Sequence, residues 1–277
     1  MRPSEVVRRA ADYLARHDVE SPRATAELLL GSVLRTNRAG LYTRSAGLSV
    51  DQARTFGRLL CRRCSGTPSQ HLTGEQWFRR VLLKVRPGTF IPRPETEILV
   101  DTALEAIEGR QAPTVVDVGT GCGAIALALK DERPDARVWA TDLSRDAVAL
   151  ARENADRLKL DVRFLEGDLL WPMSPELRGR LHLVMSNPPY VRPEEVVDLP
   201  SDVRADPESA LVGDLRLTER LLDEAFVWLT AGGAVVIEIG SEQGEEVAAA
   251  ASGAGFANVR VIPDLVGRDR VLAATRP

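Results

Sequence analysis

The stretch Asp117-Val118-Gly119-Thr120-Gly121-Cys122-Gly123 decides the fold class of this 277-residue chain. Its first two residues end Thr114–Val118, an apolar run typical of a buried strand. The stretch then leads into Ala124–Lys130, which has the pattern of a helix. Glycine at alternate positions lets the backbone approach a ligand closely, and a helix N-terminus offers N–H groups and positive potential. The stretch therefore predicts a strand–loop–helix unit that binds a nucleoside cofactor.

The glycine pattern leaves the cofactor open. It fits the dinucleotide signature G-x-G-x-x-G/A, and a purely structural turn is a further alternative. Asp117, two residues before the first glycine, favours S-adenosylmethionine, because an acidic group there can meet the amino end of that cofactor. Asp142 ends the next predicted strand, about 20 residues on, where a carboxylate can accept both ribose hydroxyl hydrogens. Asp142 could instead cap the helix that follows it.

Strands and helices alternate from residue 113 to the end of the sequence. This alternation predicts a parallel sheet covered by helices on both faces, an α/β fold. The last two predicted strands, Val259–Ile262 and Val271–Ala274, are joined by a short connection, so they should be antiparallel. The other strands are expected at Thr114–Val118, Val138–Thr141, Val162–Glu166, Leu181–Ser186 and Ala234–Ile239.

The region before this α/β part has a different pattern. Residues 1–74 show helical spacing, with helices expected to start at Ser21-Pro22 and at the capping-box pattern Ser49–Gln52. Residues 75–94 suggest a short hairpin that serves as a linker. We therefore expect a helical domain at 1–74, a hairpin linker at 75–94 and a cofactor-binding domain at 95–277.

The charge distribution and the cysteine content limit the classes of function that this chain can have. The formal net charge of -4 is the sum of a basic front, with 12 Arg and 6 acidic residues in 1–74, and an acidic remainder. Such asymmetry can mark contact with a nucleic acid or an acidic protein, although arginines on helix exteriors can also be merely solvated. No stretch approaches the ~18 apolar residues of a membrane span, and Met1–Glu5 lacks the apolar core of a signal peptide. Three cysteines in a chain of this length indicate a reducing compartment, so we expect a cytoplasmic protein.

Two further loops follow predicted strands. After the third strand comes Gly167–Trp171, in which Asp168 could accept a hydrogen bond from an adenine amino group and Trp171 could pack on the ring, with Leu169 beside them. Leu181–Ser186 runs into Asn187-Pro188-Pro189-Tyr190. The Asn187 side chain and the Pro188 carbonyl can accept the two hydrogens of a planar amide or aryl amine, and Tyr190 can bound the flat group.

Asn187–Tyr190 resembles the hallmark of methyltransferases that act on planar nitrogens, including base amines and glutamine amides. Further segments resemble the bacterial peptide-chain-release-factor glutamine N5-methyltransferases: Gln70–Glu75, Phe90–Glu97, Asp202–Arg204 with Pro207 and Ala210-Leu211, Glu238–Gly240 with Gln243-Gly244, and Asp264–Arg270. The resemblance implies a class I S-adenosylmethionine-dependent methyltransferase fold: Rossmann-like, with a mainly parallel seven-stranded sheet, an antiparallel last strand and a small N-terminal helical bundle.

The same resemblance implies the substrate. The acceptor would be the glutamine of the Gly-Gly-Gln loop in class I peptide chain release factors, with the helical front docking that protein. The segment Arg93–Thr96, which includes Glu95, would cover the methionine end of the cofactor or the approach of the substrate loop. Two departures put the substrate in doubt: Ala205 and Asp206 stand where the family usually has an aromatic residue and a glutamate, and the glycine-bearing stretch after them is shortened near 212–215.

Other interpretations stay open. The Asn187–Tyr190 chemistry also suits an amino-methyltransferase of DNA or RNA bases, although the acidic catalytic half argues against one. A paralogue acting on another amide and a cofactor-binding protein without turnover are further alternatives. Cys61 and Cys64 have only half of a metal-ligand pattern, so we expect no metal. We also expect a monomer with no direct nucleic-acid or membrane contact.

The expected site has three groups of residues. The catalytic group is Asn187, Pro188, Pro189 and Tyr190. The cofactor-binding group is Asp117, Gly119, Thr120, Gly121, Cys122, Gly123, Asp142, Asp168, Leu169, Trp171 and Asn187. The substrate-binding group is Asn187, Pro188, Pro189, Tyr190, Arg93 and Glu95.

Overall fold

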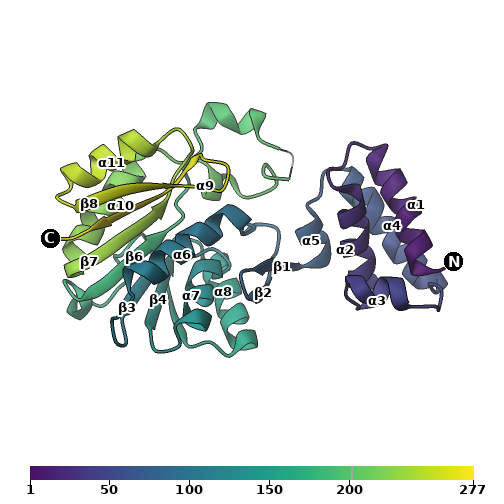
Figure 1. Cartoon of the computed structure of the whole chain (residues 1–277), viewed down its shortest axis with the longest axis horizontal. Helices are drawn as coiled ribbons and strands as arrows, with labels where there is room; N and C mark the ends of the chain where they lie inside the picture. The colour runs from purple at the N-terminus through teal and green to yellow at the C-terminus, as the bar shows by residue number, and fades with distance from the viewer. Residues whose placement is uncertain (201) are drawn as a thin grey trace. The chain divides into compact units, whose positions relative to one another are not determined.

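The computed structural model describes residues 1–200 and 202–277 and separates them into two compact units (Figure 1). Unit 1 comprises Met1–Glu75 together with Pro200–Ala205, and unit 2 comprises Gln76–Leu199 together with Asp206–Pro277. The segment Pro200–Ala205 thus belongs to the helical unit although it lies far along the sequence. Its Asp202–Arg204 motif is part of the family-like pattern of the chain.

Unit 1 is built from helices around one apolar core. Its helices are α1 (Pro3–Ala15), α2 (Pro22–Leu34), α3 (Arg38–Thr43), α4 (Val50–Cys64) and α5 (Ser69–Thr73). Leu14, Leu29, Leu30 and Phe56 from α1, α2 and α4 are buried together. Within α1 the buried residues Val7, Ala10 and Leu14 follow each other at intervals of three and four, the helical spacing that is visible in the sequence.

The ends of these helices test the expected capping signals. The capping box of α4 is confirmed, because the Ser49 hydroxyl accepts from the Gln52 N–H and the Gln52 side chain accepts from the Ser49 N–H. The expectation that Ser21 caps α2 is wrong for its side chain: Ser21 has φ +46° and makes no side-chain cap hydrogen bond. Pro22, whose φ is already helical, starts that helix. The short helices α3 and α5 have too few residues for a periodic pattern and were not expected.

Unit 2 contains a seven-stranded sheet in the order β5-β4-β3-β6-β7-β9-β8. Its strands are β3 (Thr114–Val118), β4 (Arg137–Asp142), β5 (Val162–Glu166), β6 (Leu181–Ser186), β7 (Leu229–Glu238), β8 (Ala257–Pro263) and β9 (Asp269–Thr275). All neighbours up to β7 are parallel, and β9 is antiparallel to both β7 and β8. The predicted mainly parallel sheet with an antiparallel last strand is confirmed. β7 begins at Leu229 instead of Ala234, with a register irregularity against β6.

Helices cover both faces of this sheet. They are α6 (Glu97–Ala106), α7 (Ala124–Glu132), α8 (Arg145–Leu158), α9 (Glu208–Leu211), α10 (Leu215–Trp228) and α11 (Gly244–Gly253), with short 3-10 turns η1 (Pro94–Thr96), η2 (Pro175–Leu177) and η3 (Pro193–Asp198). Val115 of β3 packs in one core with α6, α7 and α8, whereas Val116 packs in the other with α10 and α11. Because successive strand residues face opposite sides, the apolar run of β3 is buried on both faces.

A small hairpin precedes the sheet in the sequence. It consists of β1 (Glu75–Phe78) and β2 (Val81–Lys84), and β2 lies against α7 and α8. Asn154 of α8 is fully buried and accepts from the Lys84 N–H at 2.7 Å. Its amide group donates to the Lys84 and Cys122 carbonyls at 3.0 and 2.9 Å. Asn154 thereby links the hairpin to the glycine loop.

Candidate active site

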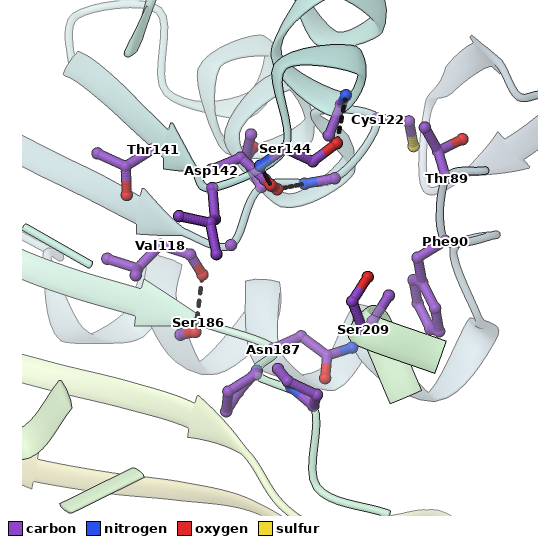
Figure 2. Close-up of a pocket in the computed structure, with 18 of the residues that line it drawn as sticks. Thr89, Phe90, Val118, Cys122, Thr141, Asp142, Ser144, Ser186, Asn187 and Ser209 are labelled. Atoms are coloured by element: carbon purple, nitrogen blue, oxygen red, sulfur yellow. Dashed lines mark hydrogen bonds between the residues drawn. The ribbon is translucent and has the colours of Figure 1, made fainter. Parts of the chain in front are cut away.

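A cavity of about 460 Å³ opens at the carboxyl ends of β3, β4 and β6 (Figure 2). The glycine loop and the residues after β4 form one part of its wall, and Asn187–Pro189 after β6 form another. Figure 2 shows Asn187, Ser209 and Phe90 at the end of the cavity away from Asp142 and Ser144. This is where ligands bind in open α/β sheets, since loops that leave adjacent strand ends diverge there.

The glycine loop has a backbone that other residues adopt only with strain. Gly119, Gly121 and Gly123 have φ of +73°, +57° and +89°. A Cβ at Gly123 would also lie 2.9 Å from Leu127 Cδ1 and 3.2 Å from Ala151 Cβ. Glycine is therefore required for conformation throughout the loop and for close helix packing at Gly123. Gly119, Thr120, Gly121 and Cys122 line the cavity, and Gly123 lies behind them as the N-cap of α7.

Asp117 lies beneath this loop and is fully buried. Its Oδ2 accepts from the Thr120 hydroxyl at 2.7 Å and from the Ala126 N–H at 3.1 Å. Its Oδ1 has no hydrogen-bond partner among the residues that the structure describes. Burial, with a smaller contribution from the Asp142 charge, raises the pKa of Asp117 to about 7. The side chain braces the loop and keeps one acceptor atom uncommitted.

Asp142 ends β4 and reaches the cavity. Its Oδ2 accepts from the Gly121 N–H and its Oδ1 from the Ser144 N–H, both at 2.8 Å. Burial raises its pKa above the usual value, and these two N–H groups lower it. The N-cap of α8 is Ser144, whose hydroxyl accepts from Ala147, so Asp142 is not the cap. One carboxylate thus joins the glycine loop to the loop after β4.

The loop after β5 contributes fewer residues than expected. Asp168 and Leu169 line the cavity, and Asp168 forms an ion pair with Arg220 at 2.6 Å. Leu169 has φ +45°, a left-handed conformation that is uncommon for a branched apolar residue. Trp171 lies outside the cavity wall with 85% of its surface exposed. The structure therefore does not bring Trp171 to the position for ring packing that its place in the sequence suggested.

The Asn187–Tyr190 loop is split between the cavity and the interior. Asn187, Pro188 and Pro189 line the cavity. Tyr190 lies outside the lining set, and its hydroxyl donates to Glu238 Oε1 at 3.2 Å. Burial, together with the nearby Glu238 carboxylate, raises the pKa of Tyr190, so its hydroxyl keeps its proton. Its expected role as a wall for a flat group thus stays a prediction.

Of the segment Arg93–Thr96 that was expected at the site, only Thr96 lines the cavity, and residues that precede this segment line it as well. Gly88, Thr89, Phe90, Pro92 and Thr96 line it, whereas Arg93 and Glu95 do not. The Arg93 guanidinium pairs with Asp206, whose carboxylate is fully buried, and lies 5.6 Å from the Phe90 ring centroid. Asp206 also accepts from the Ile91 N–H at 3.1 Å.

Asp206 belongs to one of the two departures from the family pattern, and it has a structural role. It stands where a glutamate is usual, and its ion pair with Arg93 fastens the start of the 206–210 segment to the strand-like residues 90–93. Pro207, Ser209 and Ala210 of that segment line the cavity. The shorter acid therefore holds one side of the cavity wall in place.

Several wall residues were not expected from the sequence. They are Thr89, Phe90, Leu143, Ser144, Ser186, Ser209 and Leu217. Phe90 lies within the family-like Phe90–Glu97 segment, which was the one signal that could have found it. Ser186 ties β6 to β3 through a hydrogen bond to the Val118 carbonyl at 2.7 Å.

The sheet order and this site together define the chain as a class I S-adenosylmethionine-dependent methyltransferase. Residues 94–202 match the family described as Methyltransferase small domain, and residues 5–74 match the PrmC N-terminal domain. The chain belongs to the family of release factor glutamine methyltransferases. It is 42% identical to the release factor glutamine methyltransferase of Moorella thermoacetica, covering 98% of this chain and 96% of that one. It is 39% identical to that of Deinococcus radiodurans, covering 100% and 99%.

Solved structures support the fold. A 16S rRNA N2 G1207 methyltransferase of Thermus thermophilus, in complex with AdoMet and guanosine, aligns with TM-score 0.56 and 18% identity over 73% of this chain and 50% of that one. A ribosomal protein L11 methylase of Lactobacillus delbrueckii subsp. bulgaricus aligns with TM-score 0.50 and 22% identity over 70% and 84%. At this identity the likeness extends to the fold alone.

Two kinds of feature are absent from the described residues, 1–200 and 202–277. No helix in these ranges is long and apolar enough to cross a membrane. No group of three or more His, Cys, Asp or Glu side chains in them is placed to hold a metal ion. Cys61 and Cys64 are free thiols, exposed and half-buried respectively. Cys122 is a buried free thiol whose pKa burial raises to about 12.

Proposed function

We propose that this chain transfers a methyl group from S-adenosylmethionine to the side-chain amide nitrogen of the glutamine in the Gly-Gly-Gln loop of class I peptide chain release factors, and so supports translation termination. The observation that carries the proposal is one cavity lined both by the glycine loop with Asp142 and by Asn187 with Pro188. The names of the relatives with near full-length similarity point to the same substrate.

The residues on one side of the cavity suit the cofactor. The Asp142 carboxylate would accept the ribose hydroxyls, and Leu143 and Leu169 offer apolar surface to the base, with Asp168 near its amino group. Asp117 does not itself line the cavity, but its buried carboxyl beneath the glycine loop has one oxygen, Oδ1, without a hydrogen-bond donor, which favours a positively charged ammonium group near the loop. When bound, S-adenosylmethionine supplies a methyl group on a positively charged sulfur.

The residues on the other side suit a planar amide. Its nitrogen lone pair is delocalised into the carbonyl, so the nitrogen is a weak nucleophile while it stays planar. The Asn187 side-chain oxygen and the Pro188 carbonyl would accept its two hydrogens, orient the nitrogen and stabilise the positive charge that develops there. The nitrogen lone pair forms the new N–C bond, the electrons of the S–C bond pass to sulfur, and one nitrogen proton leaves to water.

The partner surface is assigned to unit 1. Residues 1–74, which make up most of this unit, contain 12 arginines and 6 acidic residues and so have the opposite sign to the rest of the chain, which suits an acidic protein surface. We propose that unit 1 docks the release factor, that Arg93 and Glu95 border the approach of the substrate loop, and that the enzyme is a cytoplasmic monomer without a nucleic-acid partner.

A labelled-methyl assay tests the substrate. The protein is incubated with cofactor carrying a labelled methyl group and with a class I release factor, the same factor with its loop glutamine changed to alanine, or DNA. We expect label on the unmodified release factor alone. Label on the alanine version or on DNA would contradict the proposal and favour another amide or a base-modifying activity.

Charge reversal in unit 1 tests the docking role. Arg8, Arg58 and Arg62 are exposed, and we expect the triple change to glutamate to raise KM for the release factor about 10-fold or more, because rim charges of this kind steer and hold a complementary partner. Cofactor affinity, measured by calorimetry, should stay unchanged. The matched control changes the same arginines to lysine, which keeps the charge, and should retain the KM. An unchanged KM in the glutamate variant would mean that docking does not use this surface.

A further inference from the structure

Behind Asn187 lies a series of hydrogen bonds that ends at a buried carboxylate. The Asn187 Nδ2 donates to the Thr96 hydroxyl oxygen at 3.3 Å. The Thr96 hydroxyl lies near enough to the Glu238 carboxylate to lower its pKa as a hydrogen-bond donor, and Glu238 also accepts from the Tyr190 hydroxyl at 3.2 Å. Thr96 and Glu238 are each only 2% exposed.

These groups come from separate parts of unit 2. Thr96 ends η1 and precedes α6, Asn187 follows β6, and Glu238 is the last residue of β7. β6 and β7 are adjacent parallel strands, so Asn187 and Glu238 leave the same edge of the sheet. Thr96 and Asn187 both line the cavity.

Hydrogen bonds and charges from neighbouring side chains affect the pKa of Glu238. Burial raises its pKa, and the hydrogen bond from Thr96, the charge of Arg270 and the hydrogen bond from Tyr190 lower it, whereas the Glu95 charge raises it. Arg270 on β9 is itself paired with Asp264 at 3.5 Å. Glu238 Oε2 is buried and has no hydrogen-bond partner among the described residues, so it is an open acceptor for the Thr96 proton.

At a pH above its raised pKa, Glu238 is an ionised carboxylate, which can only accept hydrogen bonds. The Thr96 proton therefore points to Glu238, which leaves the Thr96 oxygen only lone pairs to present to Asn187. The amide of Asn187 must then turn its NH₂ group to Thr96 and keep its oxygen for another partner. In the reversed orientation the Asn187 amide oxygen would face a lone pair of the Thr96 oxygen. The Asn187 NH₂ group would then lie where the oxygen is needed to accept a hydrogen bond from the substrate.

We infer that Thr96 and Glu238 are positioning residues that set the orientation of the Asn187 carboxamide, so that its oxygen is presented to the hydrogen of the substrate amide. The inference rests on the proposed acceptor role of Asn187. A carboxamide is nearly symmetric in shape, so packing alone does not choose between its two orientations, whereas a one-directional series of hydrogen bonds does.

Removal of the Thr96 hydroxyl is the first test. Thr96→Val keeps the shape of the side chain, and in mildly alkaline buffer we expect kcat to fall about 10- to 100-fold, the range typical of a misplaced catalytic group. KM for the release factor and the affinity for the cofactor should stay within about three-fold, since neither depends on the amide orientation. Thr96→Ser restores the hydroxyl and should recover most of kcat.

A matched control lies on the helix that follows. Thr102 of α6 is also buried, but its hydroxyl bonds to the Ile98 carbonyl of its own helix at 2.9 Å. Thr102→Val should leave kcat unchanged. Glu238→Gln provides a second route, because its NH₂ group can donate to Thr96 and so removes the one-directional constraint; we expect a loss of kcat of similar size.

A spectroscopic readout separates orientation from catalysis. In the cofactor-free protein the Asn187 side-chain NH₂ resonances should shift in Thr96→Val and return in Thr96→Ser. Wild-type kcat in Thr96→Val, or an equal loss in Thr96→Ser, would overturn the inference. If Asn187→Ala is inactive while Thr96→Val is fully active, only the positioning role fails; if Asn187→Ala itself is active, the proposed function fails first.

Discussion

Replacement of Asn187 by alanine is expected to reduce methyl transfer to background while the protein still binds S-adenosylmethionine within a few-fold of wild type. Asn187 lines the cavity and its Nδ2 is committed to Thr96, which leaves its oxygen as the acceptor for the substrate. Loss of one preorganised hydrogen-bonding group at a reacting centre typically costs about 10²–10³-fold in rate. The second acceptor, the Pro188 carbonyl, cannot by itself orient both hydrogens. Label transfer and cofactor calorimetry on the same preparation measure the two effects.

The control for this change is another asparagine of unit 2. Asn258 on β8 is exposed and has φ +52°, so Asn258→Gly removes its side-chain hydrogen bond to Thr275 without backbone strain. This variant should methylate normally. Turnover in Asn187→Ala at the wild-type rate would refute the assigned role, and loss of cofactor binding in that variant would place Asn187 in the cofactor subsite instead.

Asp142→Ala is expected to weaken cofactor binding by about 10² or more. Hydrogen bonds to a charged group are worth about 1.5–3 kcal/mol each, and this carboxylate is proposed to accept two from the ribose. It also accepts the N–H groups of Gly121 and Ser144, so its removal frees both loops that frame the cavity. Calorimetric titration with the cofactor measures the change directly.

Two related variants sharpen the interpretation. In Asp142→Asn one of the two side-chain oxygens is replaced by an NH₂ group, so the side chain cannot accept from the Gly121 and Ser144 N–H groups with one oxygen each. The affinity of this variant for the cofactor should therefore also fall. Asp146, in the exposed first turn of α8, is the matched control, and Asp146→Ala should bind cofactor normally. Asp142→Ala with affinity within about three-fold of wild type would remove this carboxylate from the cofactor site.

Most of the fold was predictable because its signals are local. The run Thr114–Val118 is rich in valine and buried along its whole length, as expected of a strand covered on both faces, and glycine was expected where φ is positive. The antiparallel β8–β9 pair followed from the short connection between them. The strand order and the start of β7 at Leu229 were not predictable, because they depend on pairing with β6 and not on the residues of β7 alone.

The residues of the candidate site also include some that the sequence predicts and some that it does not. Asp142, Asn187 and the glycine loop follow strand ends, so their convergence could be expected from the topology of an α/β sheet. Trp171 also follows a strand end, yet it is largely exposed, and no local signal gives the direction of its side chain. Thr96 lines the cavity, as the resemblance of Arg93–Thr96 implied, whereas Phe90 lines it from a segment that precedes the first strand of the sheet and was not expected to reach the site.

The sequence by itself determined the chemistry available to this protein: a glycine loop after a buried strand, a carboxylate one strand later and an amide flanked by prolines at Asn187. These are properties of continuous segments, and the backbone conformation of such segments depends on their own residues. Only the tertiary structure decided which side chains meet, such as Arg93 with Asp206 and Asn187 with Thr96 and Glu238. The reason is physical: a buried polar atom must find its partner within hydrogen-bonding distance, and the fold, not nearness in the chain, determines which atoms are that close.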